Sequence, residues 1–317
     1  MKKMILAVLV LLAIAAASIL YLSPAAQLAG YQHVEQWRAG LHERRANVND
    51  LDISYYEGGP QNAETVLLVH GFGADKSTWL WFARELTERY HVIAVDLPGF
   101  GASDRPHGSY DVGTQSERLA AFIDVLSIRR LHLVGHSMGG HIAALYAARY
   151  PQQVVSLALM ANAGITAPQR SAFFQRMEEQ GDNPLLVESP PQFDQLLDWL
   201  FVAPPQLPER LHQYLAQRAV DDGAHQRQIF DHLQQRYLPL EPELPRINAP
   251  TLLLWGDQDR ILDVSSVEVM KPLLADVSVV IMKGCGHTPM FECPEETAGH
   301  YRQFIDAQGL PTSGSAQ

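Results

Sequence analysis

Short runs of apolar residues alternate with amphipathic segments along most of the chain. The apolar runs are typical of buried strands and predict strands at 51–57, 65–70, 91–96, 131–134, 154–160, 251–255 and 277–282. Segments with apolar positions three or four residues apart predict helices at 79–88, 116–126, 138–150 and 295–307. This alternation predicts an α/β domain with a mostly parallel central sheet, helices on both of its faces, and 51–57 as an edge strand.

The alternation of strands and helices stops after 154–160. Residues 167–246 show helical periodicity and many prolines but no clear strand. We therefore expect a helical cap insertion over the carboxyl-terminal edge of the sheet, where open α/β folds bind ligands. Its apolar run 199–202 is too continuous for one helix face, which leaves packing inside the cap, a lipid-sized cavity or contact with a bilayer open. The whole domain is expected to span 47–308, and the polar tail 309–317 is expected to be disordered.

The first 22 residues have the pattern of a membrane anchor. Residues 4–22 carry no charge and would form a helix about 28 Å long, close to the roughly 30 Å of a bilayer core. A cleaved signal peptide is the alternative, but its apolar region is normally shorter. Because Lys2 and Lys3 precede the span, the positive-inside rule predicts a cytoplasmic N-terminus and a translocated domain.

An amphipathic segment follows the predicted anchor, at 23–46. Apolar side chains recur there every three or four residues, which predicts one apolar face of a helix over 25–46: Leu28, Tyr31, Val34, Trp37 and Leu41. The pattern fits a juxtamembrane helix that lies on lipid or on a partner chain. It fits equally well a helix that packs on its own domain, and it leaves a homodimer open.

Composition narrows the class of protein. Apolar residues make up 47% of the chain, enough for a sizeable core. The formal charge of −11 makes the chain a poor candidate for a nucleic-acid binder, which needs a clustered basic surface. With only two cysteines, a disulfide-stapled fold and a multi-cysteine metal site are excluded. Outside the cytoplasm Cys285 and Cys293 could still pair, although nothing in the sequence requires it.

The sequence Gly-His-Ser-Met-Gly at 135–139 is the strongest chemical signal. It lies between a predicted strand and a predicted helix, where its glycines permit a sharp turn that presents a serine hydroxyl at the sheet edge. Ser137 is therefore the candidate nucleophile. A serine needs a base, which a third group orients.

Histidine is the expected base. His287 follows the last predicted strand and would lie beside the Ser137 turn at the same edge of the sheet. His70 and His136 also lie near this edge, but in tight turns where structural hydrogen bonds are expected. The acid should follow the strand 251–255, where three candidates are Asp257, Asp259 and Asp263.

Two backbone N–H groups are candidates for an oxyanion hole. Gly71 to Gly73 follow the strand 65–70, and the N–H of Phe72 would pair with that of Met138 at the start of the next helix. Two such donors are worth several kcal/mol of barrier. A simple glycine-rich turn is the alternative.

In this order, the sequences HGFG, DLPGFGASD, GHSMGG, WGDQD and GCGHTP resemble the α/β-hydrolase superfamily over residues 50–307. The family's W-G-x-x-D pattern implies Asp259 as the triad acid, with Asp257 as the second choice. Ser137 excludes members with an aspartate nucleophile, the epoxide hydrolases and haloalkane dehalogenases. His136 is closer to esterases and lipases than to carbon–carbon bond hydrolases, and Phe72 departs from the HGGG hole of some lipases.

The combination of anchor, amphipathic segment and capped domain resembles bacterial membrane-anchored lipases and phospholipases A. This resemblance implies a serine hydrolase of lipid esters, without cofactor or metal, on the periplasmic side of the cytoplasmic membrane. Its partners would be a fatty-acyl ester substrate and the bilayer, the latter through residues 4–22 and 25–46. A broad carboxylesterase, a monoacylglycerol lipase, and a non-catalytic lipid-binding protein on a hydrolase fold are the alternatives.

Overall fold

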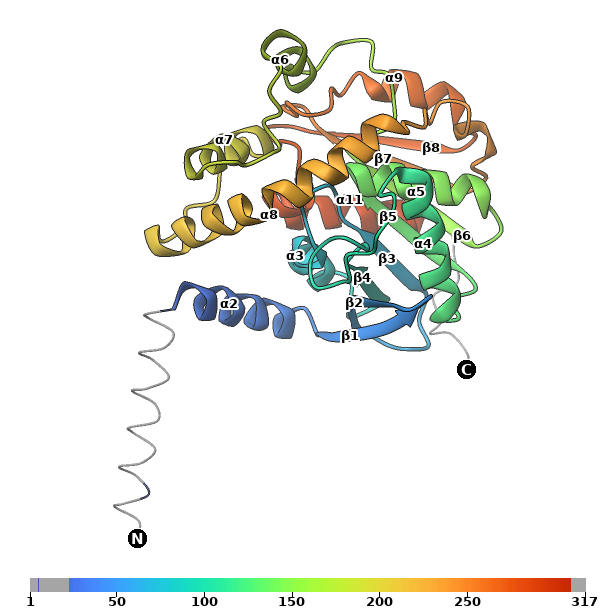
Figure 1. Ribbon diagram of the computed structural model, residues 1–317. Coiled ribbons are helices and arrows are strands. Elements are labelled where there is room, and N and C mark those ends of the chain that lie inside the picture. The colour runs from blue at the N-terminus through green and yellow to red at the C-terminus, as the bar shows by residue number, and fades with distance from the viewer. Residues whose placement is uncertain (1–4, 6–22, 309–317) are drawn as a thin grey trace.

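A computed structural model describes residue 5 and residues 23–308 (Figure 1). Its centre is an eight-stranded sheet in the order β1-β2-β4-β3-β5-β6-β7-β8. The strands are β1 (Leu41–Val48), β2 (Leu51–Gly58), β3 (Thr65–Val69), β4 (His91–Val95), β5 (Leu131–His136), β6 (Val154–Met160), β7 (Thr251–Gly256) and β8 (Val277–Met282). From β4 to β8 neighbouring strands are parallel, and β1, β2 and β4 are joined by antiparallel pairs. The predicted α/β class and mostly parallel sheet are confirmed.

Helices cover both faces of the sheet because side chains alternate along each strand. Leu67 and Val69 of β3 belong to one core cluster, whereas Val66 and Leu68 belong to the other. The first cluster includes residues of α4 (Val112–Val125), α5 (Met138–Arg149) and α9 (Ser266–Met270). The second includes residues of α3 (Leu80–Arg84), α10 (Pro289–Glu292) and α11 (Pro294–Ala307). Of three short 3₁₀ helices, Lys76–Trp79 contributes to the second cluster, whereas Leu244–Arg246 and Lys271–Leu273 pack with the first.

The chain between β6 and β7 is helical, and no described residue of 167–246 lies in a strand. It forms α6 (Ala172–Gln180), α7 (Pro190–Leu200) and α8 (Glu209–Gln235), which gather at one end of the sheet (Figure 1). Phe193 of α7 and Ala216 of α8 are buried in a small core of their own. The cap is thus held together partly by contacts that do not involve the sheet.

The helix predicted over 25–46 is wrong in its second half. Helix α2 spans Pro24–Arg38, and β1 begins at Leu41. Asn49 and Asp50 both have positive φ, at 49° and 65°, which is the geometry of a type I′ hairpin turn. This turn pairs β1 with β2, so that β1 is the edge strand and the prediction of 51–57 as the edge is also wrong. The sheet therefore begins before residue 47.

The predicted apolar face of α2 is divided between the domain and solvent. Helix α2 lies against α8, α3 and β1, and Glu35 faces inward and is buried. Trp37 is 76% exposed and Val34 is 45% exposed. Packing on the chain's own domain therefore accounts for one side of α2. Contact of the outer side with lipid, or with a second copy in a homodimer, stays a prediction.

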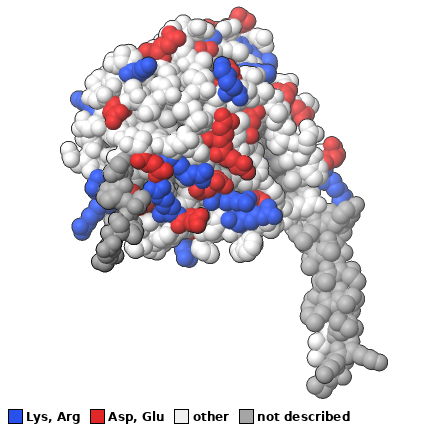
Figure 2. All heavy atoms as spheres, turned by 180° about the vertical axis from the view of Figure 1, so that it is seen from behind, with Lys and Arg blue, Asp and Glu red and all other residues white. Residues whose placement is uncertain are grey.

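The predicted anchor at 4–22, apart from residue 5, and the predicted tail at 309–317 lie outside the described residues. Within the part of the chain that the structure describes, no helix is both long and apolar enough to cross a bilayer. On the face turned away from the viewer in Figure 1, basic side chains lie among acidic ones (Figure 2). Exposed ion pairs of this kind, such as Arg89 with Asp306 at 2.6 Å, contribute little to stability.

A buried ion pair joins the loops after β3 and β4. Lys76 Nζ lies 2.7 Å from Asp96 Oδ2, and the side chain of Asp96 is fully buried. Asp96 also accepts hydrogen bonds from the backbone N–H groups of Lys76 and Ala102, at 2.6 and 2.8 Å. Because Lys76 lies shortly after the 70–73 turn, the Asp96 carboxylate holds the segment after β3 against the segment after β4 at this edge of the sheet.

We expect Asp96→Asn to lower the free energy of unfolding by about 3–5 kcal/mol, because it removes the buried counter-charge of Lys76 and leaves the ammonium with only the half-exposed carboxylate of Glu43, at 3.2 Å. Urea unfolding followed by circular dichroism measures the change. The matched control, Asp306→Asn in the exposed pair with Arg89, should cost less than about 1 kcal/mol. Equal effects of the two substitutions would contradict a structural role for the buried pair.

Candidate active site

Ser137 occupies a sharp turn between β5 and α5. Its φ of +53° is rare for a residue with a side chain, and its carbonyl accepts hydrogen bonds from the N–H groups of His141 and Ala163. A Cβ on Gly139 would lie 2.3 Å from the His70 carbonyl oxygen, so this position requires glycine. The close packing of backbone on both sides of the turn holds the half-buried serine at the carboxyl end of β5.

His287 and Asp259 are in contact. His287 Nδ1 lies 2.9 Å from Asp259 Oδ2, and the Asp259 side chain is fully buried. The other carboxylate oxygen, Oδ1, accepts hydrogen bonds from the N–H groups of Ile261 and Leu262, at 2.8 and 3.0 Å. These bonds fix the plane of the carboxylate, which in turn orients the imidazole.

The competing residues are engaged elsewhere. Asp257 lies 3.2 Å from Lys283 Nζ and accepts the Gly284 N–H, and this hydrogen bond lowers the pKa of the Asp257 carboxyl. His70 Nδ1 donates to the Gly71 carbonyl oxygen, and its Nε2 accepts from the Leu97 N–H. The structure thus pairs His287 with Asp259, the first choice from the sequence.

His136 joins the His287 loop to the Ser137 turn. Its Nε2 lies 2.8 Å from the carbonyl oxygen of His287, and the two imidazole rings are 4.8 Å apart. Because His136 immediately precedes Ser137, the loop after β8 and the turn after β5 lie side by side, although 151 residues separate His136 from His287. The sequence expectation that these two segments meet at one sheet edge is confirmed.

The two candidate oxyanion donors lie at the same place. A Cβ on Gly71 would come within 3.1 Å of Ser137 Cβ, so the 70–73 turn passes directly against the serine. Phe72 packs edge-on against Phe100 and Phe230, with ring centroids 6.3 and 5.8 Å apart. Met138 is the first residue of α5, where a backbone N–H has no acceptor within its own helix. Its N–H also lies at the positive end of the helix dipole.

A pocket of about 120 Å³ opens beside Ser137. Its walls are mainly apolar and come from the 70–73 turn, α5 and the cap: Phe72, Met138, His141, Phe173, Phe174, Phe230, Leu233 and Tyr237 are among them. His141 was not predicted from the sequence; its position one helical turn after Ser137 was the available signal. Phe230 and Tyr237 had no comparable signal because they come from the cap.

A larger apolar cavity of about 660 Å³ lies between α2 and the cap. Leu28 and Tyr31 of α2 line one side, and Trp81 and Phe201 line others. Phe201 belongs to the continuous apolar run 199–202, so one member of that run does line a cavity large enough for part of a lipid. This cavity connects the helix that follows the predicted anchor with the cap.

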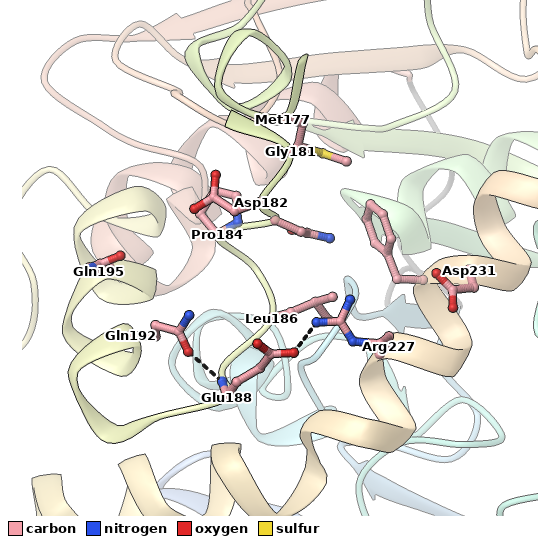
Figure 3. Close-up of a pocket in the computed structure, with 12 residues that line it drawn as sticks. Met177, Gly181, Asp182, Pro184, Leu186, Glu188, Gln192, Gln195, Arg227 and Asp231 are labelled. Atoms are coloured by element: carbon pink, nitrogen blue, oxygen red, sulfur yellow. Dashed lines mark hydrogen bonds and ion pairs between the residues drawn. The ribbon is translucent and has the colours of Figure 1, made fainter. Parts of the chain in front are cut away.

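The cap also contains a polar pocket of about 320 Å³ (Figure 3). Arg227 forms an ion pair with Glu188, and Gln192 accepts the Glu188 N–H at 2.7 Å. Phe230 lines this pocket as well as the one beside Ser137. The phenyl ring of a single cap residue therefore lies between a charged pocket and the apolar pocket.

Burial keeps the histidines around Ser137 neutral. It lowers the pKa of His141 to about 4, and it holds the pKa of His136 well below its ordinary value, with a smaller contribution from charge on His287. The pKa of His70 is lowered for the same reason. His287 is set apart from these three by its direct contact with a buried carboxylate.

Cys285 and Cys293 are free thiols whose Sγ atoms lie 2.9 Å apart. Burial raises the pKa of both, which disfavours the reactive thiolate. Their pairing outside the cytoplasm stays a prediction. Among residues 5 and 23–308, no three His, Cys, Asp or Glu side chains are grouped so as to hold a metal ion.

Comparison with known proteins identifies a family model for the α/β-hydrolase fold, which matches residues 64–294. A monoacylglycerol lipase of Mus musculus is 30% identical over 85% of this chain and 84% of its own. Lipase 1 of Psychrobacter immobilis is 33% identical over 81% of this chain and 85% of its own. A crystal structure of a bacterial membrane phospholipase A is 58% identical, covers 98% of this chain and 100% of its own, and superposes with a TM-score of 0.90.

The buried His141 predicts that stability falls as the pH falls. Its pKa is about 4 in the folded state and about 6.5 when exposed, so the unfolded chain takes up a proton first. The stabilisation is complete above pH 6.5, and about 2 kcal/mol should be lost between pH 8 and pH 5. The free energy of unfolding, measured by urea unfolding at several pH values, should change less with pH in His141→Gln than in the unaltered protein. The control is His107→Gln, at an exposed histidine. If this variant reduced the pH dependence of the unfolding free energy as much as His141→Gln does, the assignment to His141 would be contradicted.

Proposed function

The chain belongs to the α/β-hydrolase fold family, and we propose that it is a carboxylic ester hydrolase acting on lipids, of the lipase or phospholipase A type. The observation that carries the proposal is the 2.9 Å contact between His287 and the buried Asp259, in a loop held against the Ser137 turn. The candidate nucleophile, base and acid lie on segments that leave the sheet at one edge, which supports the arrangement required for acyl transfer.

In the proposed reaction, Ser137 Oγ attacks the acyl carbonyl carbon while His287 accepts the hydroxyl proton. Asp259 keeps the imidazole in the required tautomer and stabilises its positive charge. The N–H groups of Phe72 and Met138 donate to the oxyanion. Collapse of the intermediate expels the alcohol, which takes the proton from His287. Water, deprotonated by His287, then attacks the acyl carbon of the acyl-enzyme. The second intermediate collapses with cleavage of the bond to Ser137 Oγ, which takes the proton back from His287 as the fatty acid leaves.

The apolar walls of the site support a lipid substrate. Aromatic cap residues surround the pocket beside Ser137, and a larger apolar cavity lies against α2. Three similar proteins are described as a lipase, a monoacylglycerol lipase and a membrane phospholipase A. An acyl chain would be held by burial of its methylenes, each worth about 0.8 kcal/mol.

A monoacylglycerol lipase is the second candidate, favoured by the 30% identity with the mouse enzyme over most of both chains. A broad carboxylesterase would differ in hydrolysing only short esters, and a lipid-binding protein on a hydrolase fold would hydrolyse none. Product analysis on phosphatidylcholine, monooleoylglycerol and a short-chain nitrophenyl ester separates these cases. Hydrolysis of the short ester alone would contradict the lipid assignment.

We expect a fluorophosphonate probe to label the protein, and Ser137→Ala to abolish both labelling and ester hydrolysis. The rate should fall by roughly 10⁶-fold, the loss typical when the nucleophile of a triad is removed. The matched control Ser278→Ala, on the exposed edge strand β8, should keep both. Labelling that persists in Ser137→Ala would place the nucleophile elsewhere, and an unlabelled protein would favour the non-catalytic alternative.

We further propose that residues 4–22 anchor the protein in a bacterial cytoplasmic membrane, with the catalytic domain on the periplasmic side. This topology is supported by the uncharged run and by the two lysines before it, Lys2 and Lys3. The exposed Trp37 of α2 offers an aromatic side chain for the membrane interface. A tethered site would act at the surface where its lipid substrate is concentrated.

The topology predicts that alkaline phosphatase fused to the C-terminus is active and that the fusion fractionates with membranes. Deletion of 1–22 should abolish this activity, because the fusion then stays in the cytoplasm. Activity only of a cytoplasmic reporter would overturn the orientation. A mature protein whose N-terminal sequence begins after Ser23 would show a cleaved signal peptide instead of an anchor.

A further inference from the structure

The peptide groups of His287 are held from two sides. Its N–H donates to the carbonyl oxygen of Leu200, the last residue of α7, at 3.1 Å. Its carbonyl oxygen accepts from His136 Nε2 at 2.8 Å. The backbone of His287 is thus a bridge between the cap and the Ser137 turn, and its position depends on both.

Glu292 reinforces the cap side of this bridge. Its Oε1 accepts the N–H groups of Val202 and Ala203, at 2.7 and 2.9 Å. Its Oε2 accepts the N–H of Gly286 at 2.7 Å. Hydrogen bonds to a carboxylate are shorter and stronger than those between neutral groups. One side chain therefore joins the segment after α7 to the residue immediately before His287.

The packing around Gly286 leaves little freedom at this junction. A Cβ at that position would lie 2.9 Å from both Glu292 Oε2 and the Leu200 carbonyl oxygen, and 3.2 Å from the Val202 N. The His287 loop, the end of α7 and Glu292 are consequently in contact without intervening space. A shift of α7 relative to the sheet would have to move the backbone that carries His287 or break these hydrogen bonds.

We propose that Glu292 is a positioning residue that couples the cap to His287, so that the alignment of His287 with Ser137 depends on where the end of α7 lies. This inference rests on the proposed function, in which His287 is the base. Helix α7 also presents Phe193 and Leu197 to the apolar cavity beside α2. The hydrogen bonds of Glu292 thus connect a surface suited to an acyl chain with the base of the reaction.

The test compares two conservative variants, Glu292→Gln and Glu292→Asp, in the full-length protein. The amide replaces one acceptor oxygen with a donor that faces a backbone N–H. The shorter aspartate keeps the charge but cannot span the distance between Gly286 and the segment after α7. We expect either change to lower kcat for a short-chain nitrophenyl ester by about 10–100-fold, because small displacements of a catalytic group have effects of this size. KM should stay within about twofold.

Matched controls are Glu295→Gln and Glu295→Asp, which make the same chemical changes three residues away, at an exposed position in the first turn of α11. These variants should keep kcat within about twofold. All rates are expressed per active site, counted as the end point of fluorophosphonate labelling, and thermal unfolding is measured in parallel. Loss of kcat in the Glu295 variants as well would show a general effect of charge and overturn the proposal.

A substitution on the cap side tests the coupling itself. Ala203→Pro removes one N–H that Glu292 accepts without altering a side chain that lines the pocket beside Ser137. If the two residues act through one contact, the second substitution adds little to the first. The kcat of the double variant E292Q/A203P should then lie within about twofold of the kcat of whichever single variant is less active. Effects that multiply would show independent roles and overturn the coupling.

The proposal also fails if the Glu292 variants unfold at lower temperature but keep the unaltered kcat per active site, since Glu292 would then only stabilise the cap. Failure of the proposed function has a different signature. In that case the unaltered protein itself neither reacts with the probe nor hydrolyses the ester, and it cannot be distinguished from Ser137→Ala.

Discussion

At Ser137 the chain passes from strand β5 to helix α5 through a single residue with a φ of +53°, and the rest of the site is arranged around this turn. Such a backbone costs on the order of 1–3 kcal/mol and persists only where its surroundings over-determine it. Here the backbone of Gly139 lies against the carbonyl oxygen of His70, and the backbone of Gly71 lies against the side chains of His136 and Ser137. The strands buried on both sides of β5 supply the stability that offsets this strain.

Parallel strands explain why residues far apart in the chain meet at this turn. The segments after β3, β5, β7 and β8 all leave the sheet at its carboxyl-terminal edge, and they carry Phe72, Ser137, Asp259 and His287 in that order. The site is also poor in charge apart from the Asp259 carboxylate, because burial keeps the neighbouring histidines neutral. In such surroundings one oriented carboxylate acts strongly on the imidazole it contacts.

The cap and α2 turn this general site into one suited to apolar substrates. Phe230 of α8 contacts Phe72, and α2 packs on the same long helix. The segment that follows the predicted anchor and the cap wall beside Ser137 therefore pack on one and the same helix. A lipid approaching from a membrane would meet α2 and the cap before it reached Ser137, which is the physical link between the proposed anchor and the proposed chemistry.

Most of the framework followed from local pattern. The strands 154–160 and 277–282 have the bounds predicted for them, because a continuous apolar run shows the length of a strand, although only the first is buried along most of its length and the edge strand 277–282 is largely exposed. Ser137, Asp259 and His287 could be proposed as site residues because each follows a predicted strand in a recognisable motif. The prediction failed at Leu41–Val48, where four consecutive exposed residues hide the strand period and only the Asn49-Asp50 turn gives a signal.

The sequence by itself determined the α/β class, the candidate nucleophile and base, a short list of candidate acids, and the presence of a helical cap, since each is written in residues close together in the chain. Tertiary structure alone decided which carboxylate reaches His287, that His141 and Phe230 line the pocket, and that Glu292 joins the cap to the His287 loop. The hydrogen bonds of Glu292 to the cap span about 90 residues. Contacts of this kind depend on how helices dock on the sheet, and no local periodicity encodes them.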